Sequence, residues 1–483
     1  MKYLLIILYF LPFISQAQSV KWDDPIVVND NNTIGNTRPK VAVTKDGNPL
    51  VMWGKATNQG VYVSKLNNGS FTSPLKVTPD GINAFVQSWA GPGLDARGDT
   101  AYVTFKSQPE SSGFVYVVRS TDGGKTFGDT IRVSDNNWSR FPEVAILPNG
   151  NPVVTFMDFD KDFHDPRYVV AASSDGGKSF GNTVNASGKA PGEACDCCPG
   201  FIMADQKRIT ILFRNNDNDL RDIWASISTD GGKTFELAKD IDNNNWMIGA
   251  CPSTGPEAIT VGDSLISVWM SGATGRSVVN VGTANITDLN VGINAVVTPD
   301  VANAIQNYPK IAGDQSVLAV TWQEVAQSSR NVMFGMSITG ASGLQKFTPI
   351  QVNVNSQGVQ QNPDIAYDGD YVHLVWQDIT AKKLMYRRGK ISTVAGFESL
   401  SKASLNATIY PNPATNVLTI NISDQSILNS KIQLNNVLGQ TVLSTTLSNN
   451  TNNHIPVGHL TPGVYTLQLS NQNSTLIEKI EIQ

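Results

Sequence analysis

One eight-residue phrase occurs three times in this chain and restricts the folds that the chain can adopt. The phrase reads STDGGKTF at Ser120–Phe127, SSDGGKSF at Ser173–Phe180 and STDGGKTF at Ser228–Phe235, so that its aspartates recur at an almost constant interval. An aspartate at this position accepts hydrogen bonds from backbone N–H groups that follow it, and the Gly-Gly pair supplies positive φ angles, so the phrase predicts a hairpin turn. The closing phenylalanine is expected to anchor the turn against its own strands. A long repeat of constant period indicates supersecondary units that are stacked or arranged radially.

A second repeat, centred on a proline, gives the number of these units. Each unit has a proline, a short apolar strand, a turn, and a second apolar strand that ends in an aromatic residue. The prolines follow one another at nearly equal steps and number seven: Pro39, Pro92, Pro142, Pro199, Pro256, Pro309 and Pro363. We expect each proline at the first residue of an inner strand, where no ladder donor is lost.

The repeated phrase matches the Asp-box, and on these motifs the chain resembles the sialidase (BNR-repeat) superfamily. The resemblance implies an all-β fold, a β-propeller in which seven blades are favoured and six are the alternative. Enzymatic sialidases have six blades, so a count of seven departs from them. The seventh unit has only three clear strands, and Trp22–Asn29 precedes the first unit. We therefore expect the N-terminal strand to complete the last blade, which removes the exposed edges.

Both ends of the chain predict export. Lys2, the apolar stretch Leu4–Ile14 and the small-x-small sequence Ser15–Ala17 are typical of a signal peptide over residues 1–17. A membrane anchor is the alternative, but the apolar stretch is too short to span a bilayer comfortably. We expect no transmembrane segment in the mature protein.

The C-terminal stretch differs from the rest, because it has no Asp-box and no tryptophan after about Leu405. It resembles the sorting domain that type IX secretion recognises in Bacteroidetes, on YPNP at Tyr410–Pro413, LGQ at Leu438–Gln440 and PGVY at Pro462–Tyr465. An ordinary small β-sandwich is the alternative. We expect the propeller over residues 18–400 and the sorting domain over residues 405–483. The resemblance implies the type IX secretion machinery as a partner and a location outside the cell, secreted or on its surface, reached through the periplasm.

Composition bears mainly on the partners. The net charge is −5, and lysine and arginine do not cluster, so nucleic acid is not expected as a partner. The sialidase resemblance implies a glycan or glycoprotein partner instead. Two functions follow: a sialidase-type glycoside hydrolase, and a non-catalytic propeller that binds glycan or protein. In the second case Trp53, Trp89 and Trp376 are the candidates for stacking on sugar rings.

Strand direction assigns the candidate site residues to one face. The starts of the first and third strands and the end of the second strand of each blade share the face on which propellers bind ligands near their axis. The resemblance implies arginines that grip a sugar carboxylate, a tyrosine nucleophile assisted by a glutamate, and an aspartate acid/base. The residues matched to these roles are Arg38 and Arg214 for the carboxylate, Tyr308 as nucleophile, Asp158 or Asp160 as acid/base, and Glu143 or Glu257 as the assisting glutamate. In the family, one apolar residue separates this arginine from the proline, whereas in this chain Pro39 follows Arg38 directly.

Arg221 belongs to a repeat of its own. It recurs with Arg167, Arg276 and Arg330 at nearly equal steps, at the starts of third strands. The recurrence favours a bridge to a carboxylate of a neighbouring blade, and substrate binding is the alternative for Arg221. Trp89 is a further substrate-binding candidate on this face.

The four cysteines lie in two short stretches that begin neighbouring blades, Cys195, Cys197 and Cys198 in one and Cys251 in the other. Export favours a disulfide between Cys251 and one of the other three, with ligation of copper or zinc as the alternative. No cofactor is expected. The carboxylates of Asp158, Asp160 and Asp162 have the odd-position spacing of a calcium loop, which leaves calcium as an alternative, although Phe163 stands where such a loop has glycine.

Overall fold

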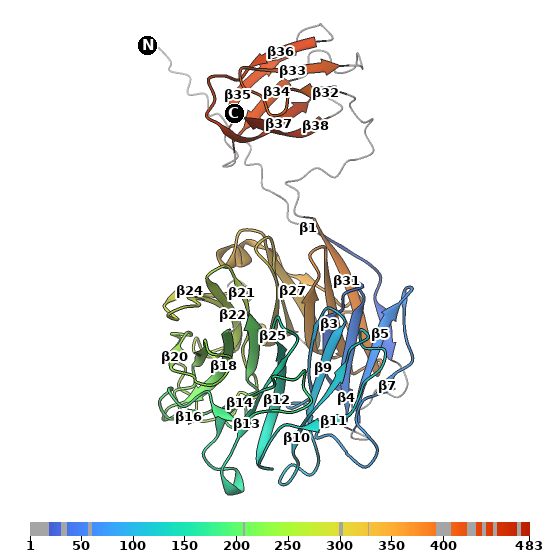
Figure 1. Cartoon of the computed structure of the whole chain (residues 1–483), viewed down its shortest axis with the longest axis vertical. Coiled ribbons are helices and arrows are strands. Elements are labelled where there is room, and N and C mark those ends of the chain that lie inside the picture. The colour runs from blue at the N-terminus through green and yellow to red at the C-terminus, as the bar shows by residue number, and fades with distance from the viewer. Residues whose placement is uncertain are drawn as a thin grey trace. The chain divides into compact units, whose positions relative to one another are not determined.

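The structure, a computed structural model, describes residues 19–29, 36–56, 60–205, 208–298, 303–326, 328–392, 407–422, 431–436, 441–447, 452–470 and 475–483. The chain divides into two compact units, residues 1–395 and 396–483, which we describe separately (Figure 1). The expected signal peptide and Leu438–Gln440 lie outside the described residues.

The N-terminal unit is a β-propeller, and in its described part seven antiparallel sheets form the blades (Figure 1). Blade 1 has β3 (Asn36–Val43), β4 (Pro49–Lys55), β5 (Gly60–Asn67), β6 (Ser70–Phe71) and β7 (Leu75–Lys76). Blade 2 has β8 (Gly93–Arg97), β9 (Thr100–Lys106), β10 (Val115–Ser120) and β11 (Thr130–Arg132). Blade 3 has β12 (Ser139–Ile146), β13 (Pro152–Asp158), β14 (Arg167–Ala172) and β15 (Val184–Asn185).

Blades 4 to 6 repeat the same order. Blade 4 has β16 (Glu193–Ala194), β17 (Phe201–Asp205), β18 (Arg208–Asn216), β19 (Ile223–Ser228) and β20 (Leu237–Asp240). Blade 5 has β21 (Glu257–Val261), β22 (Ser264–Ser271), β23 (Val278–Asn285) and β24 (Val291–Val296). Blade 6 has β25 (Ile305–Gly313), β26 (Leu318–Ala326), β27 (Ser329–Ser337) and β28 (Ile350–Gln351). Short 3-10 turns, η1 (Lys161–Phe163) and η2 (Ala341–Lys346), lie in the loops of blades 3 and 6.

Blade 7 closes the ring as the sequence predicts. It has β29 (Gln360–Tyr367), β30 (Tyr371–Asp378) and β31 (Lys383–Ser392), and the N-terminal β1 (Ser19–Trp22) and β2 (Ile26–Asn29) pair antiparallel with β31. Arg388 also forms an ion pair with Asp23 at 2.7 Å. The two ends of the propeller are thereby held in one sheet, so that the last blade presents no unpaired edge at this strand.

The aromatic residue near the end of each second strand lies in a hydrophobic cluster that joins its blade to the preceding one. All seven are at most 2% exposed: Trp53, Phe105, Phe156, Phe213, Trp269, Trp322 and Trp376. The Asp-box aromatics pack differently from the expectation. Phe235 of blade 4 is buried in a cluster that also contains Val153 and Tyr168 of blade 3, so this turn anchors its blade to the preceding one as well.

The prolines correct a second expectation. In blades 1, 3, 6 and 7 the first strand begins before the proline, and its register shifts there, for instance between Thr37 and Lys40. The residue before the proline then has a φ of 50° to 54°, which non-glycine residues rarely adopt; these residues are Arg38, Phe141, Tyr308 and Asn362. The proline therefore lies in a β-bulge, where its missing N–H also costs no ladder bond.

The C-terminal unit is a small β-sandwich. Its first sheet has β32 (Ala407–Tyr410), β33 (Val417–Ile422) and β36 (Asn452–Pro456), and its second has β34 (Lys431–Asn435), β35 (Thr441–Thr446), β37 (Gly463–Ser470) and β38 (Thr475–Ile482). Both sheets contribute buried residues to one core, such as Leu418 and Leu467. Asn412 of the YPNP sequence binds the last strand, since its side chain accepts from Glu481 N at 2.8 Å and donates to Lys479 O at 2.7 Å.

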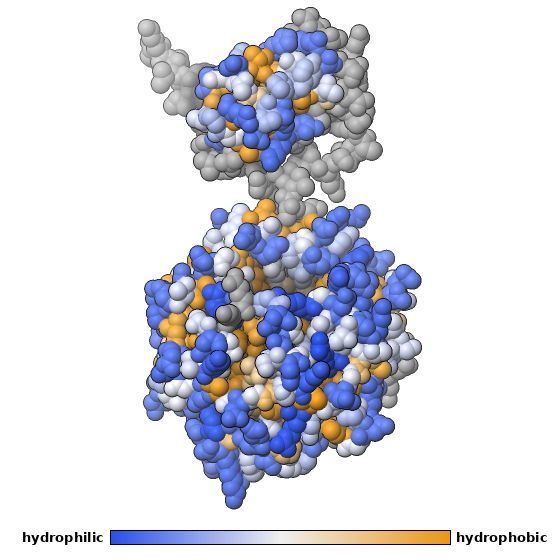
Figure 2. Space-filling model, viewed as in Figure 1, coloured by the Kyte–Doolittle hydropathy of each residue, from blue (hydrophilic) through white to orange (hydrophobic). Residues whose placement is uncertain are grey.

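Hydrophilic and apolar residues are interspersed over the face shown in Figure 2. None of the helices in the described residues is both long and apolar enough to span a membrane.

Candidate functional site

The first strands of all seven blades surround a cavity of about 380 Å³ in the propeller. Its lining runs from residues that directly follow the blade prolines, such as Lys40 and Glu143, to the ends of the first strands, such as Arg97 and Gly313. The cavity is therefore the central channel. We call the end at which the first strands begin the mouth.

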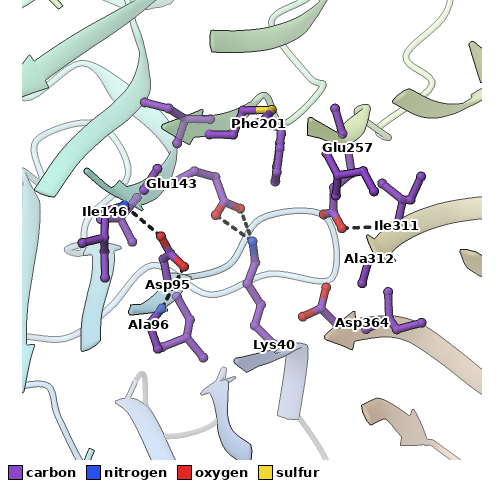
Figure 3. A pocket seen from close by; sticks show the side chains of 18 of the residues that line it. Lys40, Asp95, Ala96, Glu143, Ile146, Phe201, Glu257, Ile311, Ala312 and Asp364 are labelled. Carbon is purple, nitrogen blue, oxygen red and sulfur yellow. Dashed lines mark hydrogen bonds and ion pairs between the residues drawn. The ribbon is translucent and has the colours of Figure 1, made fainter. Parts of the chain in front are cut away.

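Charged residues that directly follow a proline form a layer in this channel (Figure 3). The Nζ atom of Lys40 lies 2.5 Å and 2.6 Å from the two carboxylate oxygens of Glu143, and that of Lys310 lies 2.5 Å from Oε2 of Glu257. Both glutamates that the sequence suggested as assistants of a tyrosine are thus engaged by lysines. Sequence reasoning missed Lys40 and Lys310, although their shared position after a proline could have identified them.

Two buried aspartates of the channel have raised pKa values. Asp95 accepts hydrogen bonds from Ala96 N and Ile146 N, both at 2.8 Å, and burial raises its pKa to about 6 (Figure 3). Asp364 accepts from Val41 N at 2.8 Å, and burial together with the negative charge of Glu257 raises its pKa to about 7, against the opposing effect of Lys310. Burial lowers the pKa of Lys310, but the carboxylates of Glu257 and Asp364 have the larger combined effect and raise it. The channel layer therefore has little net charge near neutral pH.

Arg38 and Tyr308 meet at the mouth. The guanidinium carbon of Arg38 lies 5.2 Å from the centroid of the Tyr308 ring, and both side chains are half-buried. Both residues directly precede a blade proline, and both have a left-handed backbone conformation. Gly91 makes room for this contact, because a Cβ atom there would lie 2.7 Å from Cβ of Arg38.

The pockets beside Arg38 and Tyr308 are narrow. Each has a volume of about 20 Å³, and one of them is also lined by Glu143 and Lys310 and the other by Asn362. A volume of this size holds about one water molecule. The structure thus brings Arg38, Tyr308 and Glu143 together, but it leaves no room for a sugar ring between them.

Arg38 differs in its pairing from Lys40, Lys310 and Arg140. Lys40 and Lys310 are neutralised by glutamates, and Arg140 pairs with Glu110 at 2.6 Å. Among the residues that the structure describes, no carboxylate forms an ion pair with Arg38.

Asp158 lies apart from the mouth pockets. Its carboxylate accepts from Arg167 at 2.9 Å and from the Asn136 side chain. Burial raises its pKa, with Arg167 opposing the shift. Arg167 also contacts Asp160 at 3.1 Å and Asp165 at 2.7 Å, so its guanidinium occupies the centre of the acidic loop that suggested calcium. These carboxylates belong to the same blade as Arg167, which corrects the expected bridge to a neighbouring blade at this position.

Arg214 is fully buried. It donates to the backbone carbonyl oxygens of Arg221 and Met270, both at 2.7 Å, and its guanidinium carbon lies 5.1 Å from the Trp246 ring. Its donors are directed into the protein, and it does not line the pockets beside Arg38 and Tyr308. Arg221 likewise faces inward and donates to Sγ of Cys195 at 3.1 Å.

Of the tryptophans suggested for sugar stacking, Trp89 alone is partly exposed, because Trp53 and Trp376 are buried in their blades. Trp89 packs edge to face against Phe85 and Phe141. Its ring also lies 5.8 Å from the guanidinium carbon of Arg140.

The cysteines form one compact cluster. Cys197 and Cys251 form a disulfide with Cα atoms 6.0 Å apart, which links the segments that precede β17 of blade 4 and β21 of blade 5. Cys195 and Cys198 are free and buried. In the described residues, the sulfurs of Cys195, Cys197 and Cys198 are close enough together to hold a metal ion, but Cys197 is already committed to the disulfide.

Residues 408–483 match the family described as "Secretion system C-terminal sorting domain". The tail is thus a sorting domain that directs secretion through the type IX system to the cell surface or extracellular space. No curated protein matches the chain.

Several solved structures resemble the chain at low identity. A protein of unknown function from Dyadobacter fermentans is 12% identical, with 77% of this chain and 99% of that chain covered and a TM-score of 0.45. An ulvan lyase of polysaccharide lyase family PL25 is 9% identical, with 77% and 95% covered and a TM-score of 0.48. A Hadza microbial sialidase is 12% identical, with 75% and 67% covered and a TM-score of 0.42.

Proposed function

We propose that this secreted propeller binds acidic glycans at the mouth of its central channel, with Arg38 as the residue that receives the carboxylate. The observation that carries the proposal is the half-buried guanidinium of Arg38, which faces Tyr308 and has no carboxylate partner among the described residues. Guanidinium grips a carboxylate through two parallel hydrogen bonds, which favours uronic or sialic acids over neutral sugars.

Binding without hydrolysis accounts best for the rest of the site. The glutamates that would activate Tyr308 are paired with lysines, and Asp158 is paired with Arg167. The mouth pockets admit about one water molecule, so the sugar ring would lie outside them. Sialidase-type hydrolysis is the second candidate, because Arg38 and Tyr308 lie together at the mouth as the sialidase resemblance implies.

A titration with matched variants tests the proposal. The mature protein is titrated calorimetrically with a sialylated, a uronic-acid-containing and a neutral oligosaccharide, and incubated separately with a fluorogenic sialoside. We expect binding of at least one acidic oligosaccharide, a Kd about tenfold higher for Arg38→Gln, and no turnover. Arg208→Gln is the control, since it removes the same charge from an arginine that is already paired with Asp205. Turnover that Tyr308→Phe abolishes would establish hydrolysis instead.

A further inference from the structure

An exposed disulfide covers a buried dithiol in the cysteine cluster. Cys251 is exposed and Cys197 half-buried, whereas Cys195 and Cys198 are both 0% exposed. The sulfur of Cys195 lies 3.0 Å from that of Cys198 and 3.5 Å from that of Cys197. A free thiol is therefore in van der Waals contact with one sulfur of the disulfide, close enough for thiol–disulfide exchange to begin.

The surroundings favour Cys195 as the attacking sulfur. The hydrogen bond with Cys198 and the charge of Arg221, whose Nη1 lies 3.1 Å from Sγ of Cys195, lower the pKa of the Cys195 thiol to about 7 against the effect of burial. Burial raises the pKa of the Cys198 thiol. Cys195 is thus the nucleophile of the pair, and Cys198 retains its proton until later.

We propose that the four cysteines form a thiol–disulfide relay that passes two electrons between the buried pair and the protein surface. The Cys195 thiolate attacks Sγ of Cys197, the bond between Cys197 and Cys251 breaks, and Cys251 leaves as a thiolate. Cys198 then transfers its proton to that thiolate and attacks Cys195, which releases Cys197. One disulfide and two thiols exist before and after, so this exchange needs no external oxidant.

The product has a buried Cys195–Cys198 disulfide and a Cys197/Cys251 dithiol at the surface. That surface dithiol reduces a disulfide compound from the medium by the same chemistry. The Cys251 thiolate forms a mixed disulfide with the compound, and Cys197 then resolves it and releases two thiols. Each chain thus reduces one compound with the two electrons of its buried dithiol and ends with two disulfides. The ligand class is therefore a small-molecule or peptide disulfide. This activity is independent of the glycan site.

Differential alkylation tests the relay. The native protein is used as purified, with the Cys197–Cys251 disulfide formed and Cys195 and Cys198 free. It is treated with N-ethylmaleimide without denaturant, and the labelled residues and remaining disulfide are mapped by mass spectrometry over time. We expect labels to accumulate on Cys197 and Cys251 while Cys195 and Cys198 become disulfide-bonded, because alkylation traps the surface thiols.

Two variants separate the steps. Cys198→Ser should stop the relay after the first attack, with a Cys195–Cys197 disulfide and a label on Cys251 alone. Cys195→Ser should keep Cys197 and Cys251 bonded to each other and unlabelled. Arg221→Gln should slow labelling about fivefold at pH 7 and shift its pH profile upward, since a rise of about one unit in the pKa of Cys195 lowers the thiolate fraction from about one half to about one tenth.

A persistent Cys197–Cys251 disulfide in the wild type, with Cys195 and Cys198 still thiols, would overturn the proposal. So would four cysteines that are all held by stoichiometric copper or zinc. A circular-dichroism melt of each variant shows that it is folded before labelling begins.

Discussion

The two faces of the propeller are built on opposite rules. On one face the three Asp-box turns repeat both their sequence and their bonding: Asp122 accepts from Lys125 N and Thr126 N, both at 3.0 Å, and Asp175 and Asp230 repeat these contacts at 2.9 Å or 3.0 Å. At the mouth, four blades repeat the backbone, a left-handed residue followed by a proline, but their side chains all differ: Arg38, Phe141, Tyr308 and Asn362.

The difference shows that the Asp-box face and the mouth have different roles in the propeller. The polar groups of each Asp-box aspartate are bound within the turn, so that little is left for a ligand. At the mouth the backbone conformation is the same in these four blades, but the side chains differ. We infer that the repeated turns contribute stability and that the varied mouth residues contribute recognition.

Among the destabilising substitutions, glycine-to-alanine changes on the two faces should show the largest difference in the free energy of unfolding. A Cβ atom at Gly255 of the mouth would lie 1.7 Å from Pro199 O, whereas at Gly231 of an Asp-box it would meet nothing within 4 Å. Gly255→Ala should therefore lower the free energy of unfolding by about 3 kcal/mol. Gly231→Ala, at a φ of +78°, should lower it by about 1 kcal/mol from backbone strain alone. Chemical denaturation measures both, and equal losses would contradict the contrast.

Asp364 should make the stability of the channel depend on pH between about pH 4 and 7. Its pKa of about 7 in the folded protein exceeds the unfolded value, so the folded state binds more protons between about pH 4 and 7 and loses stability as the pH rises through this range. Asp364→Asn keeps an acceptor for Val41 N and removes the titration. The variant should be more stable than the wild type by about 4 kcal/mol at pH 8, and similar to it at pH 4.

Melting curves from pH 4 to 8 measure this difference. Glu257, Lys310 and Lys40 are the charged neighbours of Asp364 and are unchanged in the variant. Parallel curves for the two proteins would show that Asp364 is ionised throughout this range.

An Asp-box substitution should have the smallest effect. Asp122→Ala removes the acceptor of two backbone N–H groups in a turn that water can reach, and should cost about 1 kcal/mol. Because hydrogen bonds from Thr126 lower the pKa of Asp122, this contribution should disappear as the pH falls through the acid range. Glycan binding should be unchanged. A loss of glycan binding in this variant would contradict the assignment of stability to the turns and of recognition to the mouth.

The sequence was sufficient for the blades because the fold depends on repeated local signals. The seven prolines, each followed by a strand that ends in an aromatic residue, predicted the number of blades. The incomplete seventh unit predicted that the N-terminal strand closes the ring. The bulges could not be predicted, because the position of a proline within a strand depends on pairing with the second strand, as in the shift between Asn307 and Lys310.

The site was predicted less well, because radial depth and pairing are tertiary properties. The positions of Arg38 and Tyr308 at strand starts placed them on the mouth face, where the structure brings them together. The same reasoning could not distinguish Arg214, which lies beneath the surface and bonds to carbonyl groups. It also overlooked Lys40 and Lys310, which neutralise the two glutamates.

The most direct test of the account is the affinity of Arg38→Gln for an acidic oligosaccharide compared with that of Asp122→Ala. Calorimetric titration of both variants and the wild type at one ionic strength measures it. The account predicts a Kd about tenfold higher for Arg38→Gln and an unchanged Kd for Asp122→Ala. Equal affinities for the wild type and Arg38→Gln would contradict it.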